Sequence, residues 1–154
     1  MNILMSSQNP LQTTTYFMLK IAKAQRNLMS ARLNQMNLHV GQEKLLMELW
    51  QKDGLTQTEL ALRLFIEPPT LTKMLRRLEN TKLLEKRKDE SDARIYRIFL
   101  TDKGRFFQKP VTELWLNSEE RILANISLEK RLLFRHLLIE IYSNLERSVA
   151  YSQK

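Results

Sequence analysis

The chain has 154 residues, of which 43% are hydrophobic, and it carries a formal net charge of +8. This length fits one domain, or one small domain with helical extensions, and the apolar fraction is enough for a core. The absence of cysteine excludes disulfides, thiolate metal sites and cysteine redox sensing. A pI near 9.9 indicates a positive surface potential, which favours nucleic acid, anionic lipid or acidic protein as partners without choosing among them.

Only three glycines and four prolines interrupt the chain, so the fold is predicted to be mostly α with few turns. The N-terminal segment MNILMSSQNPLQTTTYFMLK lacks the basic start and continuous apolar core of a signal peptide. No apolar run approaches the length that spans a membrane. These features predict a cytoplasmic protein with no membrane partner.

Two amphipathic helices are expected first. Between Thr13 and about Gln35, apolar residues recur at spacings of four and three, namely Phe17, Ile21, Ala24, Leu28 and Ala31. This seam could pack against a partner helix or cover the core of its own domain. A second helix is predicted from Gly41 to Gln51, with Asp53-Gly54 ending it where a left-handed residue is needed.

The next two helices have recognisable start signals. Thr56 and Glu59 have the spacing of a capping box, so a third helix is predicted to begin at Thr56. Pro68 and Pro69 break this helix and start a fourth, which extends to about Asn80. The apolar face of the fourth helix consists of Leu71, Met74, Leu75 and Leu78. Its remaining surface is polar and cationic: Thr70, Thr72, Lys73, Arg76 and Arg77.

The segment LLEKRKDESDARIYRIFL predicts two short strands around a polar turn that holds Asp89, Glu90 and Asp92. Thr101 is the expected N-cap of a further helix, in which Pro110 predicts a kink. Ser127 begins a last helix, which has a wide apolar stripe formed by Phe134, Leu137, Leu138, Ile141, Tyr142 and Leu145.

The third and fourth helices, joined by a short turn around Ile66 and Glu67, form a helix-turn-helix arrangement. The second helix of such a pair can enter a DNA major groove, which is about 12 Å wide. Taken alone, the cationic face of the fourth helix could equally be a solvated surface. The hairpin that follows favours DNA binding.

Residues Val40 to Phe107 resemble the MarR family of bacterial winged helix-turn-helix regulators. The most specific matches are LTQTELALRL, PPTLTKMLRRLE and DESDARIYRIFLTDKG. The last matches the wing pattern of the family, in which an Asp, a variable residue and an Arg precede a strand ending in Leu-Thr and a Lys-Gly helix start. The flanking helices match in placement and length rather than by motif.

The resemblance implies a winged helix-turn-helix domain with a two-stranded wing over residues 39–104, flanked by dimerisation helices at 1–38 and 105–154. It also implies a homodimer that binds pseudo-palindromic double-stranded DNA and represses transcription until a small aromatic or phenolic ligand binds. The apolar stripes of the first and last helices exceed what a small winged domain needs to cover. The expected dimerisation residues are Phe17, Ile21, Leu28, Leu138, Ile141 and Leu145.

By the same resemblance, Arg94 matches the wing arginine that enters the minor groove, and Asp92 matches the acid that orients it. The full set of expected DNA contacts is Thr56, Thr70, Thr72, Lys73, Arg76, Arg77, Lys86, Arg94 and Arg97. Two residues depart from the family pattern. Ala93 replaces a frequent second basic residue, and Lys82 replaces a glycine that commonly precedes the first wing strand, which puts the turn geometry in question.

An enzyme is not expected, because the sequence has no cysteine nucleophile, glycine-rich phosphate loop, nucleophile elbow or paired-histidine metal motif. No cofactor or metal is expected either: His136 and Glu140 share a helix face but lack a further ligand. The remaining alternative is a basic winged-helix module that binds a protein or nonspecific nucleic acid without ligand control.

Five aromatic residues could line the pocket of an effector, although aromatics at helical or strand spacing belong more often to a core. They are Trp50, Phe99, Phe106, Phe107 and Trp115.

Overall fold

The computed structural model describes the backbone of residues 9–152 and the side chains of residues 9–148. The expectation about a signal peptide concerns in part residues 1–8, which lie outside the described residues. The chain divides into two compact units, Met1–Ser118 and Glu119–Lys154. Across the described residues, every helix is too short or too polar to cross a membrane.

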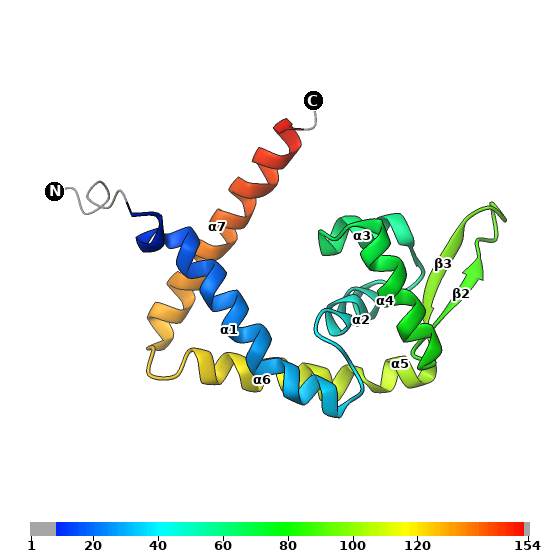
Figure 1. Ribbon diagram of the computed structural model, residues 1–154, viewed down its shortest axis with the longest axis horizontal. Coiled ribbons are helices and arrows are strands. Elements are labelled where there is room, and N and C mark those ends of the chain that lie inside the picture. The colour runs from blue at the N-terminus through cyan, green and yellow to red at the C-terminus, as the bar shows by residue number, and fades with distance from the viewer. Residues whose placement is uncertain (1–8, 153–154) are drawn as a thin grey trace. The chain divides into compact units, whose positions relative to one another are not determined.

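The first unit contains a helical region and one small sheet, and the second contains the end of α6 and the long helix α7 (Figure 1). The elements are η1 (Pro10–Gln12), α1 (Thr14–Gln35), α2 (Gln42–Gln51), β1 (Leu55–Thr56), α3 (Gln57–Leu64), α4 (Pro68–Asn80), β2 (Leu84–Lys88), β3 (Tyr96–Leu100), α5 (Asp102–Phe106), α6 (Gln108–Ile122) and α7 (Leu128–Ser152). The prediction of a mostly α fold is therefore confirmed.

Side-chain caps determine where several helices begin. Thr56 caps α3 through a complete capping box: the Glu59 amide donates to Thr56 Oγ1 at 3.2 Å, and the Thr56 amide donates to Glu59 Oε2 at 2.7 Å. Thr101 caps α5 by accepting from the Gly104 amide at 3.1 Å. Both caps were predicted, because each depends only on residues within one turn.

The sheet has three antiparallel strands in the order β1-β3-β2, one more than the predicted hairpin. β2 and β3 form the hairpin, with Leu84 opposite Leu100 and Lys88 opposite Tyr96. β1 pairs Leu55 with Ile98 on the other side of β3. A strand of two residues is too short to show an alternating pattern, so the sequence does not reveal it.

The predicted kink at Pro110 is instead a break between two helices. α5 ends at Phe106, and α6 begins at Gln108 with Pro110 in its first turn. Proline has no N–H to donate to the carbonyl four residues earlier, and its ring collides with that carbonyl in a continuous helix. In the first turn of a helix, the N–H groups have no intrahelical acceptor, so proline is tolerated there. One helix therefore ends before Pro110, and a new helix begins.

The core of the first unit is built mainly from leucine. Leu71, Leu75 and Leu78 of α4 are each at most 1% exposed, and they pack with Leu45, Leu46 and Leu49 of α2 and with the inner face of the sheet. Burying this face of α4 turns the opposite, polar face of the helix outward.

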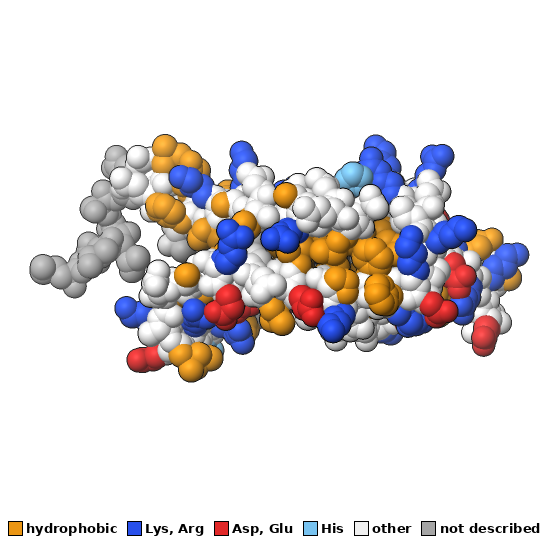
Figure 2. Space-filling model, turned by 90° about the horizontal axis from the view of Figure 1, so that it is seen from below, with side chains coloured by type: hydrophobic (Ala, Val, Ile, Leu, Met, Phe, Trp, Pro, Cys, Tyr) orange, Lys and Arg blue, Asp and Glu red, His pale blue; other side chains and the backbone are white. Residues whose placement is uncertain are grey.

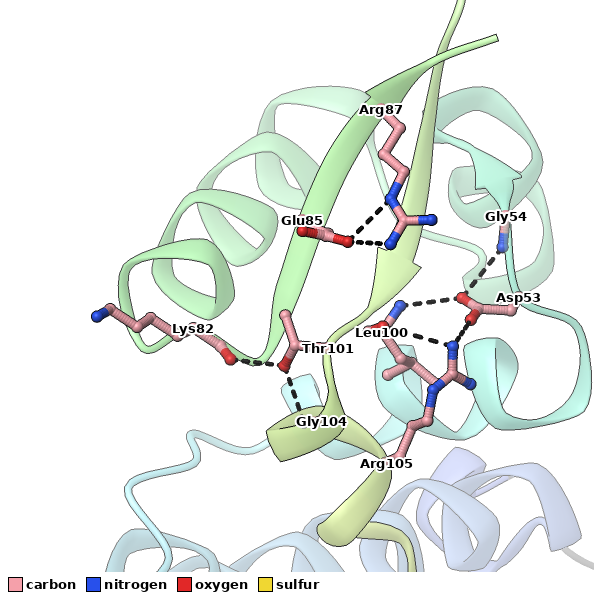
Figure 3. A network of polar contacts seen from close by, with 9 residues as sticks. All are labelled: Asp53, Gly54, Lys82, Glu85, Arg87, Leu100, Thr101, Gly104 and Arg105. Atoms are coloured by element: carbon pink, nitrogen blue, oxygen red, sulfur yellow. Dashed lines mark hydrogen bonds and ion pairs between the residues drawn. The ribbon is translucent and has the colours of Figure 1, made fainter. Parts of the chain in front are cut away.

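A polar network fixes the base of the hairpin to the helices (Figure 3). Asp53 Oδ1 accepts from the Leu100 amide at 3.0 Å and from the Gly54 amide at 3.1 Å, and Asp53 Oδ2 accepts from Arg105 Nη2 at 2.6 Å. In addition, Trp50 Nε1 donates to the Gly104 carbonyl at 3.1 Å. The wing therefore extends from a base that α2, β3 and α5 hold together.

Lys82, where the family pattern has glycine, adopts the left-handed conformation with φ 59°. The turn keeps its hydrogen bonds: the Leu83 amide donates to the Leu78 carbonyl at 2.9 Å, and Thr101 Oγ1 donates to the Lys82 carbonyl at 2.7 Å. The departure from glycine thus preserves the turn but places a side chain in a strained backbone region. Gly54 is also left-handed, with φ 75°, as predicted.

Candidate nucleic-acid interface

The outward face of α4 presents five polar side chains that are all exposed. They are Thr70, Thr72, Lys73, Arg76 and Arg77. They lie opposite the buried Leu71, Leu75 and Leu78, so packing of the helix fixes their direction. A helix that is anchored on one side and cationic on the other has the arrangement needed to lie in a DNA groove.

Thr72 is held in place by a residue that the sequence analysis missed. Gln57 Nε2, at the first position of α3, donates to Thr72 Oγ1 at 2.6 Å, and Thr72 Oγ1 donates to the Pro68 carbonyl at 2.9 Å. Because Gln57 directly follows the cap residue Thr56, the sequence places it at the start of α3. The sequence does not show its contact with Thr72, because that residue lies 15 positions later in the chain.

At the tip of the hairpin, the carboxylate of Asp92 holds the side chain of Arg94. Arg94 Nε donates to Asp92 Oδ1 at 3.1 Å, and Arg94 Nη2 donates to Asp92 Oδ2 at 3.0 Å. The hydrogen bond from Arg94 lowers the pKa of Asp92, so this acid stays ionised to a more acidic pH than an ordinary Asp. The Arg94 side chain remains 90% exposed, which leaves it accessible to a ligand.

Three other residues of the expected DNA-binding set have internal partners. Lys86 Nζ donates to Glu79 Oε2 of α4 at 3.1 Å, and Thr56 Oγ1 is occupied as the cap of α3. Arg97 donates to Asp89 and also, at 3.0 Å, to the Gly54 carbonyl. These three side chains therefore contribute to the architecture of the site.

The residues expected at a dimer interface are exposed or half-buried. Phe17 and Ile21 of α1 are 52% and 49% exposed, and Leu145 of α7 is 57% exposed. The other three, Leu28, Leu138 and Ile141, are half-buried. Figure 2 shows hydrophobic side chains lying uncovered among Lys and Arg side chains on one face of the molecule.

One of the five candidate aromatics lines a pocket of about 440 Å³ within the first unit. Trp115 of α6 faces this pocket together with residues of α1 and of the start of α2, including Lys23, Arg26 and Lys44. Trp50 and Phe107, like Trp115 itself, pack against the core. Phe99 lies under Arg87, with the guanidinium 4.8 Å from the ring centroid. Phe106 is 78% exposed and lines a separate hollow with Arg105 and Lys109.

A buried carboxylate also lines this pocket. Glu43 is 1% exposed and accepts a hydrogen bond from the Gly41 amide at 2.6 Å. Burial raises the pKa of Glu43, and the hydrogen bonds to backbone amides oppose this rise. His136 Nε2 and Glu140 Oε1 lie 3.1 Å apart on α7, and among the side chains of residues 9–148 no group of three or more metal-ligating residues is present.

Two helices joined by a tight turn, with the second helix exposed beside a β-hairpin, define a winged helix-turn-helix domain. Residues 38–96 match the model of the MarR family. This match covers the helix-turn-helix and most of the hairpin, and it agrees with the resemblance predicted from the sequence.

Among curated proteins, the chain is 45% identical over 60 residues to the HTH-type transcriptional regulator TtmR of Methylorubrum extorquens. That segment covers 39% of this chain and 31% of TtmR. A longer match, 25% identical over 134 residues, covers 87% of this chain and 89% of the uncharacterized HTH-type transcriptional regulator YybA of Bacillus subtilis.

Two solved structures place most of the chain in the same fold. A SlyA-like transcription regulator from Listeria monocytogenes superposes with a TM-score of 0.86 at 20% identity, covering 93% of this chain and 95% of that one. MepR of S. aureus, solved in complex with DNA, superposes with a TM-score of 0.76 at 27% identity, covering 89% of this chain and 99% of MepR.

Proposed function

We propose that this protein is a transcriptional regulator that binds double-stranded DNA, with α4 in the major groove and the β2–β3 hairpin reaching the minor groove. One observation carries the proposal. The buried leucine face of α4 turns Arg76 and Arg77 outward beside a hairpin whose exposed Arg94 is held by Asp92. Both elements thereby present cations in fixed directions, as groove binding requires.

The comparisons support this proposal. MepR, which resembles 89% of the chain, was solved bound to DNA. A relative from Mycobacterium tuberculosis that is 25% identical over 129 residues is named a transcriptional repressor. We therefore favour repression over activation.

We further propose that the protein acts as a homodimer. The large exposed apolar side chains of α1 and α7, such as Phe17 and Leu145, are costly to leave in water and are suited to packing against a second copy. A symmetric dimer presents two α4 helices to two half-sites about 34–36 Å apart, which predicts a pseudo-palindromic operator.

The pocket beside Trp115 supports ligand control. It is lined by an indole ring and by the cations Lys23, Arg26 and Lys44, which outnumber the carboxylate of Glu43 and so suit a small aromatic anion. We propose that such a ligand shifts the protein towards conformations in which the two α4 helices no longer match their half-sites. A titration with benzoate tests ligand control separately: tryptophan fluorescence measures binding of the ligand, and release of operator DNA measures its effect. Binding without release would disprove ligand control at this pocket.

Selection of bound duplexes from a random library tests DNA binding, symmetry and spacing together. We expect an inverted repeat that is bound roughly 10³-fold or more above random duplex at the same salt concentration. Equal binding to all sequences would instead support the alternative of a nonspecific basic winged module. Sedimentation equilibrium should show a dimer at micromolar concentration, and a folded monomer would contradict the homodimer.

Individual contacts can be distinguished by their dependence on base sequence and salt. Arg94→Ala should weaken binding and reduce the slope of log K against log salt by about one contact per subunit. Arg76→Ala and Arg77→Ala should cause losses that vary with operator sequence if these residues read bases. Uniform losses would indicate phosphate contacts.

A further inference from the structure

Arg97 of β3 joins three separate segments of the winged domain. Its Nε donates to Asp89 in the hairpin turn, and its Nη1 donates at 3.0 Å to the carbonyl of Gly54, which directly precedes β1. Nη1 also lies 4.0 Å from Glu59 Oε2 in the first turn of α3. One guanidinium therefore ties the wing to the start of the helix-turn-helix.

We propose that Arg97 is a positioning residue that holds the wing in its DNA-binding orientation, rather than a residue that contacts DNA. This inference rests on the proposed DNA-binding function. It revises the place of Arg97 in the set of DNA contacts expected from the sequence.

The Asp89 end of this bridge organises the hairpin tip. Asp89 Oδ1 accepts from the amides of Ser91 at 2.8 Å and Asp92 at 3.1 Å, while Oδ2 accepts from Arg97. The Asp89 side chain is only 10% exposed. Asp92 in turn holds Arg94, so a continuous path of hydrogen bonds connects Gly54 and Arg97 to the exposed arginine at the tip.

The two arginines of this path differ in exposure and in number of partners. The Arg94 side chain is 90% exposed and has one acidic partner, whereas that of Arg97 is 37% exposed and is engaged by oxygens from three segments. The hydrogen bond from Arg97 lowers the pKa of Asp89 to about 2, as expected for a carboxylate that is stabilised by a cation. Two guanidinium nitrogens of Arg97, Nε and Nη1, are therefore directed at oxygens within the protein.

The register of the hairpin explains why Arg97 needs an acidic partner such as Asp89. Arg97 lies directly opposite Arg87 of β2, and two like charges in a cross-strand pair oppose pairing of the strands. Arg87 is neutralised within its own strand by Glu85, and Arg97 is neutralised by Asp89. Removing Arg97 would free the hairpin tip to move, and the conformational freedom that the tip then loses on binding would oppose DNA binding.

Substitutions of both partners separate positioning from direct contact. We expect Asp89→Asn to weaken operator binding about tenfold even though it makes the protein more positive. Arg97→Lys should cause a similar loss, because an ammonium lacks the planar fork that bridges Asp89 and Gly54. If Arg97 instead contacts phosphate, Asp89→Asn should leave binding unchanged or tighter, and Arg97→Lys should retain it. Either result would overturn the proposal.

A double-mutant cycle with the tip residue provides a second test. If Arg97 acts by positioning Arg94, then Arg97→Gln should have little further effect in the Arg94→Ala background. Additive losses of affinity would contradict this. Arg63→Gln is the matched control, since Arg63 of α3 pairs with Glu48 of α2 at 3.2 Å and its loss removes the same charge and one ion pair. It should change affinity less than about twofold.

Hydrogen exchange in the free protein tests the bridge without DNA. Arg97→Gln should accelerate exchange of the Ser91 and Asp92 amides while leaving the amides of α4 protected. Unchanged exchange at the tip would mean that Arg97 does not order the wing. If the wild-type protein binds no DNA but the tip loosens as expected, the proposed function fails while the structural bridge stands.

Discussion

The carboxylate of Asp92 and the guanidinium of Arg94 face each other through two parallel hydrogen bonds of 3.1 Å and 3.0 Å. Asp92 Oδ1 also accepts from the backbone amide of Arg94 at 2.9 Å, so it fixes both the main chain and the side chain of this residue. This pairing explains why a hairpin of a basic protein contains acids. A preorganised arginine loses less conformational freedom when it binds.

Asp92→Asn should therefore lower DNA affinity, although it adds one unit of positive charge. The amide cannot accept both guanidinium hydrogen bonds, so Arg94 loses its fixed direction. Glu90→Gln is the matched control: it makes the same charge change at an exposed position of the same turn and should leave affinity unchanged or slightly increased. Fluorescence anisotropy at one salt concentration compares the two. Tighter binding by Asp92→Asn would show that the acids only repel DNA.

Gly104→Ala should destabilise the winged domain by about 2 kcal/mol or more. A Cβ at this position would lie 2.1 Å from the Leu83 carbonyl oxygen, and a backbone atom cannot move aside without disturbing the sheet. Chemical denaturation measures the loss. Phe106→Ala in the same short helix is the control and should cost much less, because Phe106 is 78% exposed. Equal losses would mean that the tight contact is not responsible.

Lys82→Gly should stabilise the protein by about 0.5–1 kcal/mol. Lys82 has φ 59°, a conformation that is strained for a residue with a Cβ but not for glycine. Asn80→Gly, at the last residue of α4, should have the opposite effect because it places glycine within the helix. Thermal unfolding distinguishes the two variants. If Lys82→Gly lowered the melting temperature, the strain at this turn would be negligible.

The contribution of Glu43 to the stability of the folded protein should decrease as the pH rises. Burial raises its pKa in the folded state above the ordinary value of 4.5, so the folded protein binds this proton more tightly than the unfolded chain does. The contribution of Glu43 to stability is therefore present below pH 4.5 and is lost as pH rises through the raised pKa. Glu43→Gln removes this dependence.

The measurement for Glu43 is the free energy of unfolding of both proteins from pH 4.5 to 8. The stability of Glu43→Gln relative to wild type should increase with pH over this window. A constant difference would show that the carboxylate titrates as it does in the unfolded chain.

Several features were predictable because they depend on neighbours within one helical turn or on one periodic face. The capping box of Thr56 and Glu59 and the start of α4 at Pro68 follow from local hydrogen bonding and ring geometry. The outward direction of Arg76 and Arg77 follows from the leucine spacing on the other side of α4. The pairing of Asp92 with Arg94, two residues apart, is equally local.

Other features depended on residues that are distant in the chain. The sequence by itself determined a basic winged helix-turn-helix and the residues that α4 exposes, since short-range periodicity and capping encode both. Only the tertiary structure decided that Gln57 holds Thr72 and that Arg97 is bound by Asp89 and the Gly54 carbonyl. The physical reason is that the sequence shows only the type and position of a cationic residue. Both are the same whether the side chain faces solvent or a carboxylate that folding brings near.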